Sequence, residues 1–183
     1  ALPYVYGLKA WAVKQTITAT GASSEVKWIN LESIPEQAYG VVIPWKGTNS
    51  VRLTGQLMQR GIRLRVSEQP FESGGKQFER GSIIILRSSN QHYPNLWNDV
   101  RDLANTNRVH LSTVSSGFVD RGYDFGSSKV RPLKARRIAL LTGEGINSNA
   151  VGEVWHYFDQ EINYPVSLIN IAGLSVSMSL GLL

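Results

Sequence analysis

The chain of 183 residues contains no cysteine and only three histidines. Without cysteine it can form no disulfide, no thiolate nucleophile and no cysteine-ligated metal site. The phosphate-binding P-loop, the HExxH zinc helix and the Gly-x-Ser-x-Gly nucleophile elbow are also missing. The usual sequence evidence for NTP hydrolysis, zinc peptidase activity and α/β-hydrolase chemistry is therefore lacking.

The first residues do not have the pattern expected of a secretory leader, and no run is expected to span a membrane. No basic segment or Met opens the chain, so we expect an excised or processed piece. Residues 162–183 are uncharged, but interspersed Asn and Ser make them a poor membrane span. Residues 174–182 alternate apolar and polar side chains, which predicts a half-buried strand. Such a strand would seek a partner edge, so a homodimer is expected.

The positive charge, +5 at neutral pH, is concentrated in one short segment. Five basic residues lie between positions 129 and 137, and without them basic and acidic residues are equal in number, 14 each. A nucleic-acid-binding face would spread its basic residues and mix them with aromatics. The cluster contains Pro132 and predicts a solvated basic linker over 129–136 and no nucleic-acid partner.

Strand and helix signals alternate through the middle of the chain. Short apolar or alternating segments predict strands, and amphipathic stripes predict helices between them. The expected strands are 39–45, 62–66, 81–86 and 109–114, and a Gly-Gly turn between aromatics predicts a β-hairpin excursion near 70–80. One helix is expected from Thr48 or Asn49 to Gly61. A second is expected after Pro94 with the apolar stripe Leu96, Trp97, Val100, Leu103 and Ala104.

This alternation indicates an α/β fold. We expect a three-layer αβα arrangement with a mostly parallel sheet, similar to flavodoxin and amidotransferase domains. The expected organisation is an irregular, extended lead segment at 1–35, an α/β region at 36–128, the basic linker at 129–136, and a βαβ unit at 137–183. This last unit is expected to open an amidotransferase-like domain and to be truncated within it. Its helix is expected to bury the stripe Val151, Val154, Trp155, Phe158 and Ile162.

The turn that opens the βαβ unit is the best candidate for ligand binding. Gly143 and Gly145 lie between strand and helix, followed by Asn147 and Ser148, where backbone amides can approach an anion. A dinucleotide fingerprint would need a third glycine at the position of Ser148, and Glu144 adds a negative charge. A tight turn without a ligand is therefore favoured, and an anion or small-metabolite site is the alternative.

Glu153, His156 and Asp159 recur every third residue on the following helix. Imidazole and carboxylate groups are legitimate metal ligands, so these three are the weak candidates for a metal or acid–base site. A solvated face opposite the apolar stripe is the favoured explanation.

Single histidines and loop aromatics are the remaining candidates. His92 and His110 stand alone in sequence and are expected to be structural. Aromatic residues at 45–47 and 123–126 are candidates for a ligand platform, and anchoring of the loops is the alternative.

Six segments, residues 2–7, 69–71, 78–85, 124–127, 137–145 and 153–156, carry a family resemblance. Together they look like the post-catalytic, C-terminal region of bacterial zinc carboxypeptidase-like proteins, which are carboxypeptidase A-like metallopeptidases. In these secreted proteins an α/β region similar to class I glutamine amidotransferases follows the peptidase domain. The resemblance implies a peptidase domain of the same polypeptide as partner, zinc in that domain, peptides as substrates and a periplasmic or extracellular location.

The same resemblance assigns no catalytic residue to this segment. The family's zinc site contains a His-x-x-Glu pair, but the residues three after the histidines are Asn95, Thr113 and Asp159. The amidotransferase nucleophile is a cysteine, and the chain has none. We therefore expect a non-catalytic accessory region without a cofactor of its own. A stand-alone α/β anion-binding module and a hydrolase with an unrecognised site are the alternatives.

Overall fold

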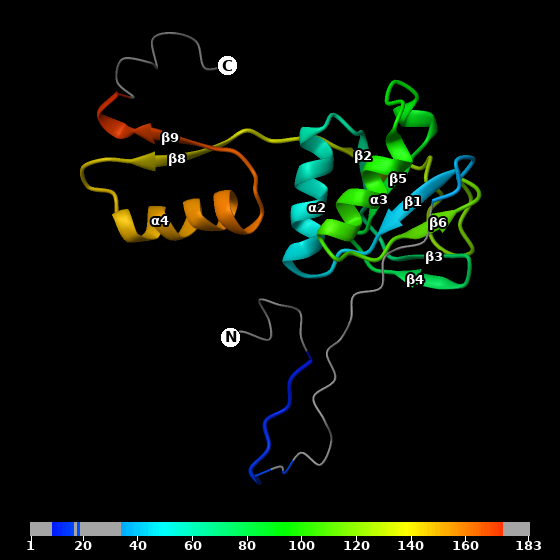
Figure 1. The fold of residues 1–183 in the computed structure, drawn as a ribbon, viewed down its shortest axis with the longest axis horizontal. Coiled ribbons are helices and arrows are strands. Elements are labelled where there is room, and N and C mark those ends of the chain that lie inside the picture. Colours follow the sequence, from blue (N-terminus) through cyan, green and yellow to red (C-terminus); the bar gives the residue numbers. More distant parts are fainter. Residues whose placement is uncertain (1–8, 17, 19–33, 174–183) are drawn as a thin grey trace.

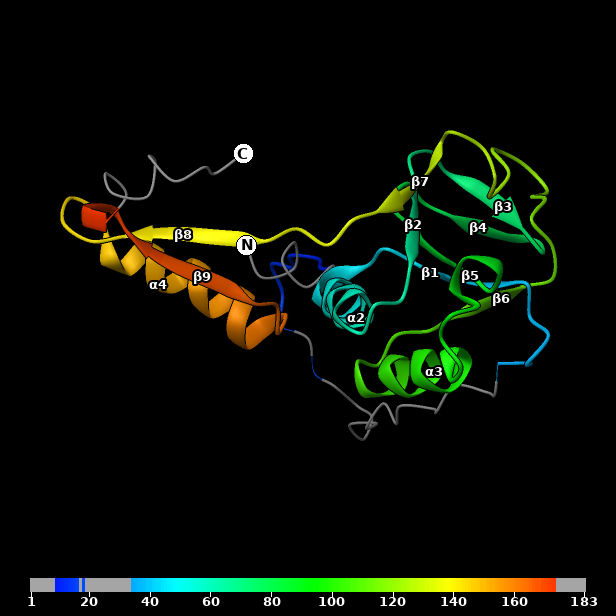
Figure 2. The same cartoon turned by 90° about the horizontal axis from the view of Figure 1, so that it is seen from above.

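The computed structural model describes residues 9–16, 18 and 34–173. Five strands form the main sheet: β1 (Gly40–Ile43), β2 (Leu64–Ser67), β5 (Ile83–Leu86), β6 (Ser112–Val114) and β7 (Val130–Leu133). Their order is β6-β1-β5-β2-β7, and every neighbouring pair is antiparallel. Helices α2 (Gly47–Gln59) and α3 (Leu96–Thr106) cover one face, and the hairpin β3 (Phe71–Ser73) and β4 (Lys76–Phe78) covers the other (Figures 1 and 2).

The central strands are buried on both faces. Ile83 and Ile85 of β5 pack in the cluster formed with α2 and α3. Ile84 lies between them in sequence and points to the opposite side, where it packs with Phe71 and Phe125. Successive side chains of a strand point to opposite faces, so a run of four apolar residues fills two separate core layers.

The prediction of a mostly parallel, three-layer αβα fold is wrong, because the main sheet is antiparallel throughout. Uninterrupted apolar runs such as residues 83–86 are typical of parallel strands, which helices cover on both faces. Here the second cover is a β-hairpin with a long loop beside it. The apolar run therefore reports burial on two sides and does not determine strand direction.

Several local predictions are confirmed. Helix α2 ends before Gly61, which has a φ of +77°. All five apolar residues of the stripe predicted for α3 are buried. The β-hairpin turns at Gly74 and Gly75, both with positive φ. The start of α2 differs from the prediction: it begins at Gly47, and the side chain of Ser50 bonds back to the carbonyl of Lys46.

A strand occupies much of the segment that the sequence predicted as a basic linker. Residues of β7 pair with β2, and the side chain of Val130 is buried in the second core layer. Lys129 and Arg131 flank this buried residue, and Arg131 forms an ion pair with Glu68. Within this edge strand the exposed positions are Arg131 and Pro132.

The predicted βαβ unit is present. It consists of β8 (Ile138–Thr142), α4 (Ser148–His156), the π-helical turn η2 (Tyr157–Glu161) and β9 (Val166–Asn170), followed by the short helix η3 (Ile171–Gly173). Strands β8 and β9 are parallel and form a separate two-stranded sheet. Both views show this unit beside α2, joined to the main sheet by the chain after β7 (Figures 1 and 2).

Two expectations lie outside the described residues: the strand at 174–182 and most of the lead segment at 1–35. Residues 9–16 and 18 of that segment contain no helix or strand. In the part of the chain that the structure describes, none of the helices has the length and apolar character needed to cross a membrane.

Candidate functional site

The residues predicted to bind a ligand are together in the turn between β8 and α4. Gly143 and Gly145 both have positive φ, and the amide of Ile146 bonds back to the carbonyl of Gly143. A Cβ at position 143 would lie 2.6 Å from Oδ1 of Asn170, so this position has no room for a larger residue. Position 143 is therefore a glycine because Asn170 of β9 lies too close to the turn for a larger side chain.

Helix α4 has an intramolecular cap at its first turn. Asn147 is the N-cap residue, and its Oδ1 accepts hydrogen bonds from the amides of Asn149 (3.0 Å) and Ala150 (3.1 Å). An anion at this helix terminus would need the same donors. Ser148 is the first helical residue. The geometry of the turn is therefore that of a side-chain cap, and an anion would have to displace Oδ1 of Asn147.

Glu153, His156 and Asp159 do not form a cluster. Glu153 and His156 belong to α4, whereas Asp159 lies in the π-helical turn, where the wider winding changes the angular spacing of side chains. Asp159 accepts a hydrogen bond from its neighbour Gln160. Across the described residues there is no group of three or more His, Asp or Glu side chains that could hold a metal ion.

The predicted loop aromatics have different roles. Trp45 packs against Gly81, where a Cβ would lie 3.3 Å from the indole ring. Phe125 is fully buried and anchors its loop in the second core layer, while Tyr123 nearby is exposed. His92 is an exposed loop residue whose Nε2 lies 3.4 Å from the carbonyl oxygen of Gly61. The prediction of anchoring is thus confirmed for Phe125.

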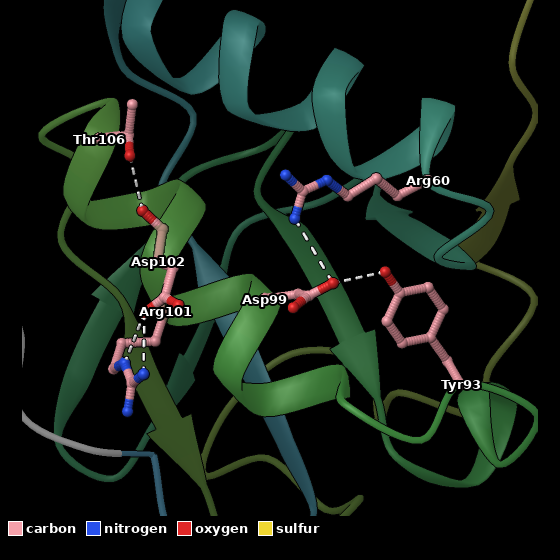
Figure 3. A network of polar contacts seen from close by, with 6 residues as sticks. All are labelled: Arg60, Tyr93, Asp99, Arg101, Asp102 and Thr106. Carbon is pink, nitrogen blue, oxygen red and sulfur yellow. Dashed lines mark hydrogen bonds and ion pairs between the residues drawn. The ribbon is translucent and has the colours of Figure 1, made fainter.

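A polar network joins α2 to the start of α3. The hydroxyl of Tyr93 donates to Oδ2 of Asp99 (2.6 Å), and Arg60 pairs with the same oxygen (3.4 Å) (Figure 3). The hydrogen bond to Asp99, with burial and the charge of Asp99, raises the pKa of Tyr93, and the charge of Arg60 lowers it. The three side chains bond to one another and so hold the end of α2 against the start of α3.

The βαβ unit carries an unusual amount of exposed apolar surface. Five of its large apolar side chains are exposed by 37 to 55 %: Leu141, Val154, Trp155, Tyr157 and Leu168. We call these five residues the uncovered apolar residues. Strand pairing puts Leu168 opposite Leu140 and Leu141 opposite Ile169, so Leu141 and Leu168 lie on opposite faces of the two-stranded sheet. The predicted helix stripe is only partly correct, because Val154 and Trp155 are exposed and Ile162 is buried.

The βαβ unit contacts the domain of the main sheet, residues 34–133, through a small junction. Arg52 of α2 binds the carbonyl and carboxylate of Glu161, and Gln59 donates to the carbonyl of Asn163 (2.9 Å). The ring of Tyr164 lies against α2 at Gly55, where a Cβ would be 3.1 Å from Cδ2. None of the uncovered apolar residues takes part in these contacts. The signal that sequence reasoning missed was the small size of the unit: two strands and a helix cannot cover one another completely.

Comparison with known proteins gives no assignment: no protein-family model matches the chain, and neither the curated proteins nor the solved structures contain a significant match.

Proposed function

We propose that this chain is a non-catalytic accessory region of a zinc carboxypeptidase-like protein, and that its βαβ unit packs against the peptidase domain of the same polypeptide. The exposure of the uncovered apolar residues is the observation that carries this proposal. The family resemblance supplies the identity of the partner. The zinc and the peptide-cleaving groups belong to the partner domain, which acts outside the cytoplasm.

Large exposed apolar side chains support an interaction role. Monomeric proteins rarely expose extended apolar surface, and where they do it commonly marks a contact with another molecule or domain. Taking a fully exposed side chain of this kind to full burial stabilises by about 1.5–3 kcal/mol, so these five, which are 37 to 55 % exposed, contribute roughly half of that each when covered. Leu141 and Leu168 lie on opposite faces, which favours a partner that encloses the unit over one that touches a single side.

The main sheet supports the same division of roles. The apolar residues of its central strands are buried in two core layers, so the sheet is covered on both faces by other parts of residues 34–133. The junction at Tyr164 and Glu161 then holds the βαβ unit on this support. In this arrangement the chain positions the peptidase domain or its peptide substrate.

The gene sequence upstream of the codon for Ala1 tests the identity of the partner. We expect it to encode a peptidase domain with a His-x-x-Glu zinc pair. A gene without such a domain would contradict the proposal at once.

Binding measured in trans tests the surface. The isolated peptidase domain should bind the chain, and the double variant Trp155→Ser/Leu168→Ser should weaken this binding by at least about tenfold. Tyr123→Ser is the matched control, because Tyr123 is exposed on the domain of the main sheet and does not belong to the βαβ unit. Equal binding by both variants, or self-association of the chain in place of binding, would contradict the proposed contact.

A further inference from the structure

A cavity of about 620 Å³ lies where the start of β1 meets the loop at residues 115–129. It is distant in sequence from the βαβ unit and plays no part in the proposed packing. Its walls include Tyr39, Ser115, Gly117, Phe118 and Asp124. The volume is within the range of small-molecule sites, which combine apolar walls with a few polar groups.

The loop that forms this wall is held in place at several points. The fully buried side chain of Phe125 anchors it in the core, and Nη1 of Arg65 donates to the carbonyl of the same residue (3.3 Å). The carboxylate of Asp120 accepts from the amide of Gly75 (3.0 Å), and Arg121 forms a β-bridge with Glu72. Long loops without regular structure are uncommon and often functional. This one is fastened at both the sheet and the hairpin.

Two aromatic side chains face the cavity. The ring of Tyr39, the residue before β1, extends to the loop, and its hydroxyl reaches Gly117, where a Cβ would lie only 2.5 Å away. A glycine at this position is what allows the ring to sit against the loop. Phe118 follows immediately, and its side chain is 78 % exposed. An aromatic residue that is exposed beside a cavity offers a large surface to a ligand at little conformational cost.

Asp124 supplies the negative charge of the cavity wall. It is the one ionisable carboxylate among the described residues that line the cavity. Oδ1 accepts a hydrogen bond from the amide of Val119 (2.9 Å), which fixes the side chain. In the part of the chain that the structure describes, no basic side chain lies within ion-pair distance of this carboxylate. The second oxygen is therefore available to a ligand.

We propose that this cavity binds an ammonium or guanidinium group carried on an apolar stem, such as the side chain of lysine or arginine. Aromatic faces attract such cations, and a carboxylate forms charge-assisted hydrogen bonds with them. The stem packs on Phe118 and Tyr39, and the cationic head meets Asp124. Arg87 lines an adjoining cavity on which Tyr39 also borders, so a free amino acid could place its carboxylate there, whereas a basic side chain within a peptide would not need this contact.

Amide NMR titration of the full chain tests the proposal. The probes are N-acetyl-arginine amide and N-acetyl-lysine amide, with free arginine as the arm that separates the two sources and N-acetyl-norleucine amide as the uncharged control. We expect saturable shifts at Gly117, Phe118 and Gly126 with the cationic probes and binding at least about tenfold weaker for the norleucine compound. Tighter binding of free arginine would identify a free amino acid as the ligand, and equal binding a peptide side chain.

Two variants test the named contacts. Asp124→Asn keeps an acceptor for the amide of Val119 and removes the charge, and Phe118→Ala removes an exposed ring. Each should weaken the cationic probes by roughly fivefold to tenfold. Tyr123→Ala, on the same loop but away from the cavity, should bind as the natural chain does. Unchanged affinity in Asp124→Asn, equal binding of the norleucine compound, or no saturable shift would overturn the proposal.

Discussion

The two parts of this molecule differ in how far the apolar side chains of their strands are buried. In residues 34–133 the side chains of the central strands are inaccessible to solvent, as for Val41 and Ile84. In residues 137–173 the strands are just as apolar, yet Leu168 is more than half exposed. The main sheet has helices on one face and a hairpin on the other, whereas the two-stranded sheet has one helix. Burial thus depends on how many layers surround a strand more than on its composition.

Truncating one leucine in each part gives the largest expected difference. Leu57→Ala removes a fully buried side chain of α2 and should lower the free energy of unfolding by about 2–5 kcal/mol. Leu168→Ala removes an exposed side chain of the same size and should change it by no more than about 0.5 kcal/mol. Urea unfolding followed by circular dichroism measures both. Comparable losses would mean that the βαβ unit shares the core of the main sheet.

The cap of α4 tests whether the βαβ unit has local stability of its own. Asn147→Ala removes the acceptor for two amides and should cost about 0.5–2 kcal/mol within that unit. Faster hydrogen exchange in α4, with unchanged exchange in α2 and α3, is the expected observation. Asn149→Ala is the control, since that residue supplies only its backbone amide to the cap. Uniform acceleration in all three helices would indicate that the two parts unfold together.

The network at Tyr93 tests the main domain and adds a dependence on pH. Tyr93→Phe removes the hydrogen bond to Asp99 and should destabilise by about 1 kcal/mol near neutral pH. Because the pKa of Tyr93 is raised by folding, this contribution is complete below about pH 10 and is lost as the pH rises through the folded-state pKa. Urea midpoints of the natural chain and the variant should therefore converge in alkali. Tyr123→Phe, at an exposed site, should show no such convergence.

The ion pair at the junction should have the smallest effect. Glu161→Gln removes the carboxylate that pairs with Arg52 but keeps the backbone carbonyl that also accepts from it. Both side chains are partly exposed, so the loss should be about 0.5 kcal/mol or less, and it should shrink in high salt. Hydrogen exchange of residues 161–164 at low and high salt measures it. A loss that salt does not reduce would indicate that the junction depends on this carboxylate through packing.

Local structure could be predicted well from the sequence, and the overall arrangement could not. The α3 stripe follows the helical period, and the two adjacent glycines of the β3–β4 turn suit positive φ, so both elements are fixed by neighbouring residues. Strand direction depends on which segments meet across the sheet. Residues 83–86 would have the same apolar pattern between parallel or antiparallel neighbours, so the sequence could not decide between them.

The candidate sites were predicted to a similar, limited extent. The Gly143 turn and its glycines could be found from spacing, but the hydrogen bonds of Asn147 that occupy the helix amides depend on a side-chain rotamer. Strand β7 was hidden because the exposed Arg131 and Pro132 separate its two core contacts, Val130 in the second layer and Leu133 at the first. The cavity beside Phe118 was missed because Tyr39 and Gly117 are far apart in sequence and come together only through the sheet.

Pro132 has a further consequence for how copies of this protein behave at high concentration. It stands opposite Arg65 in the outermost strand of the five-stranded sheet. Since proline has no amide hydrogen, it fits there with its nitrogen directed outward, and Lys129 and Arg131 add like charges along the same border. A strand from another copy would find no amide donor at Pro132, and its own basic residues would be repelled by Lys129 and Arg131. This border should therefore resist the stacking of chains into fibrils.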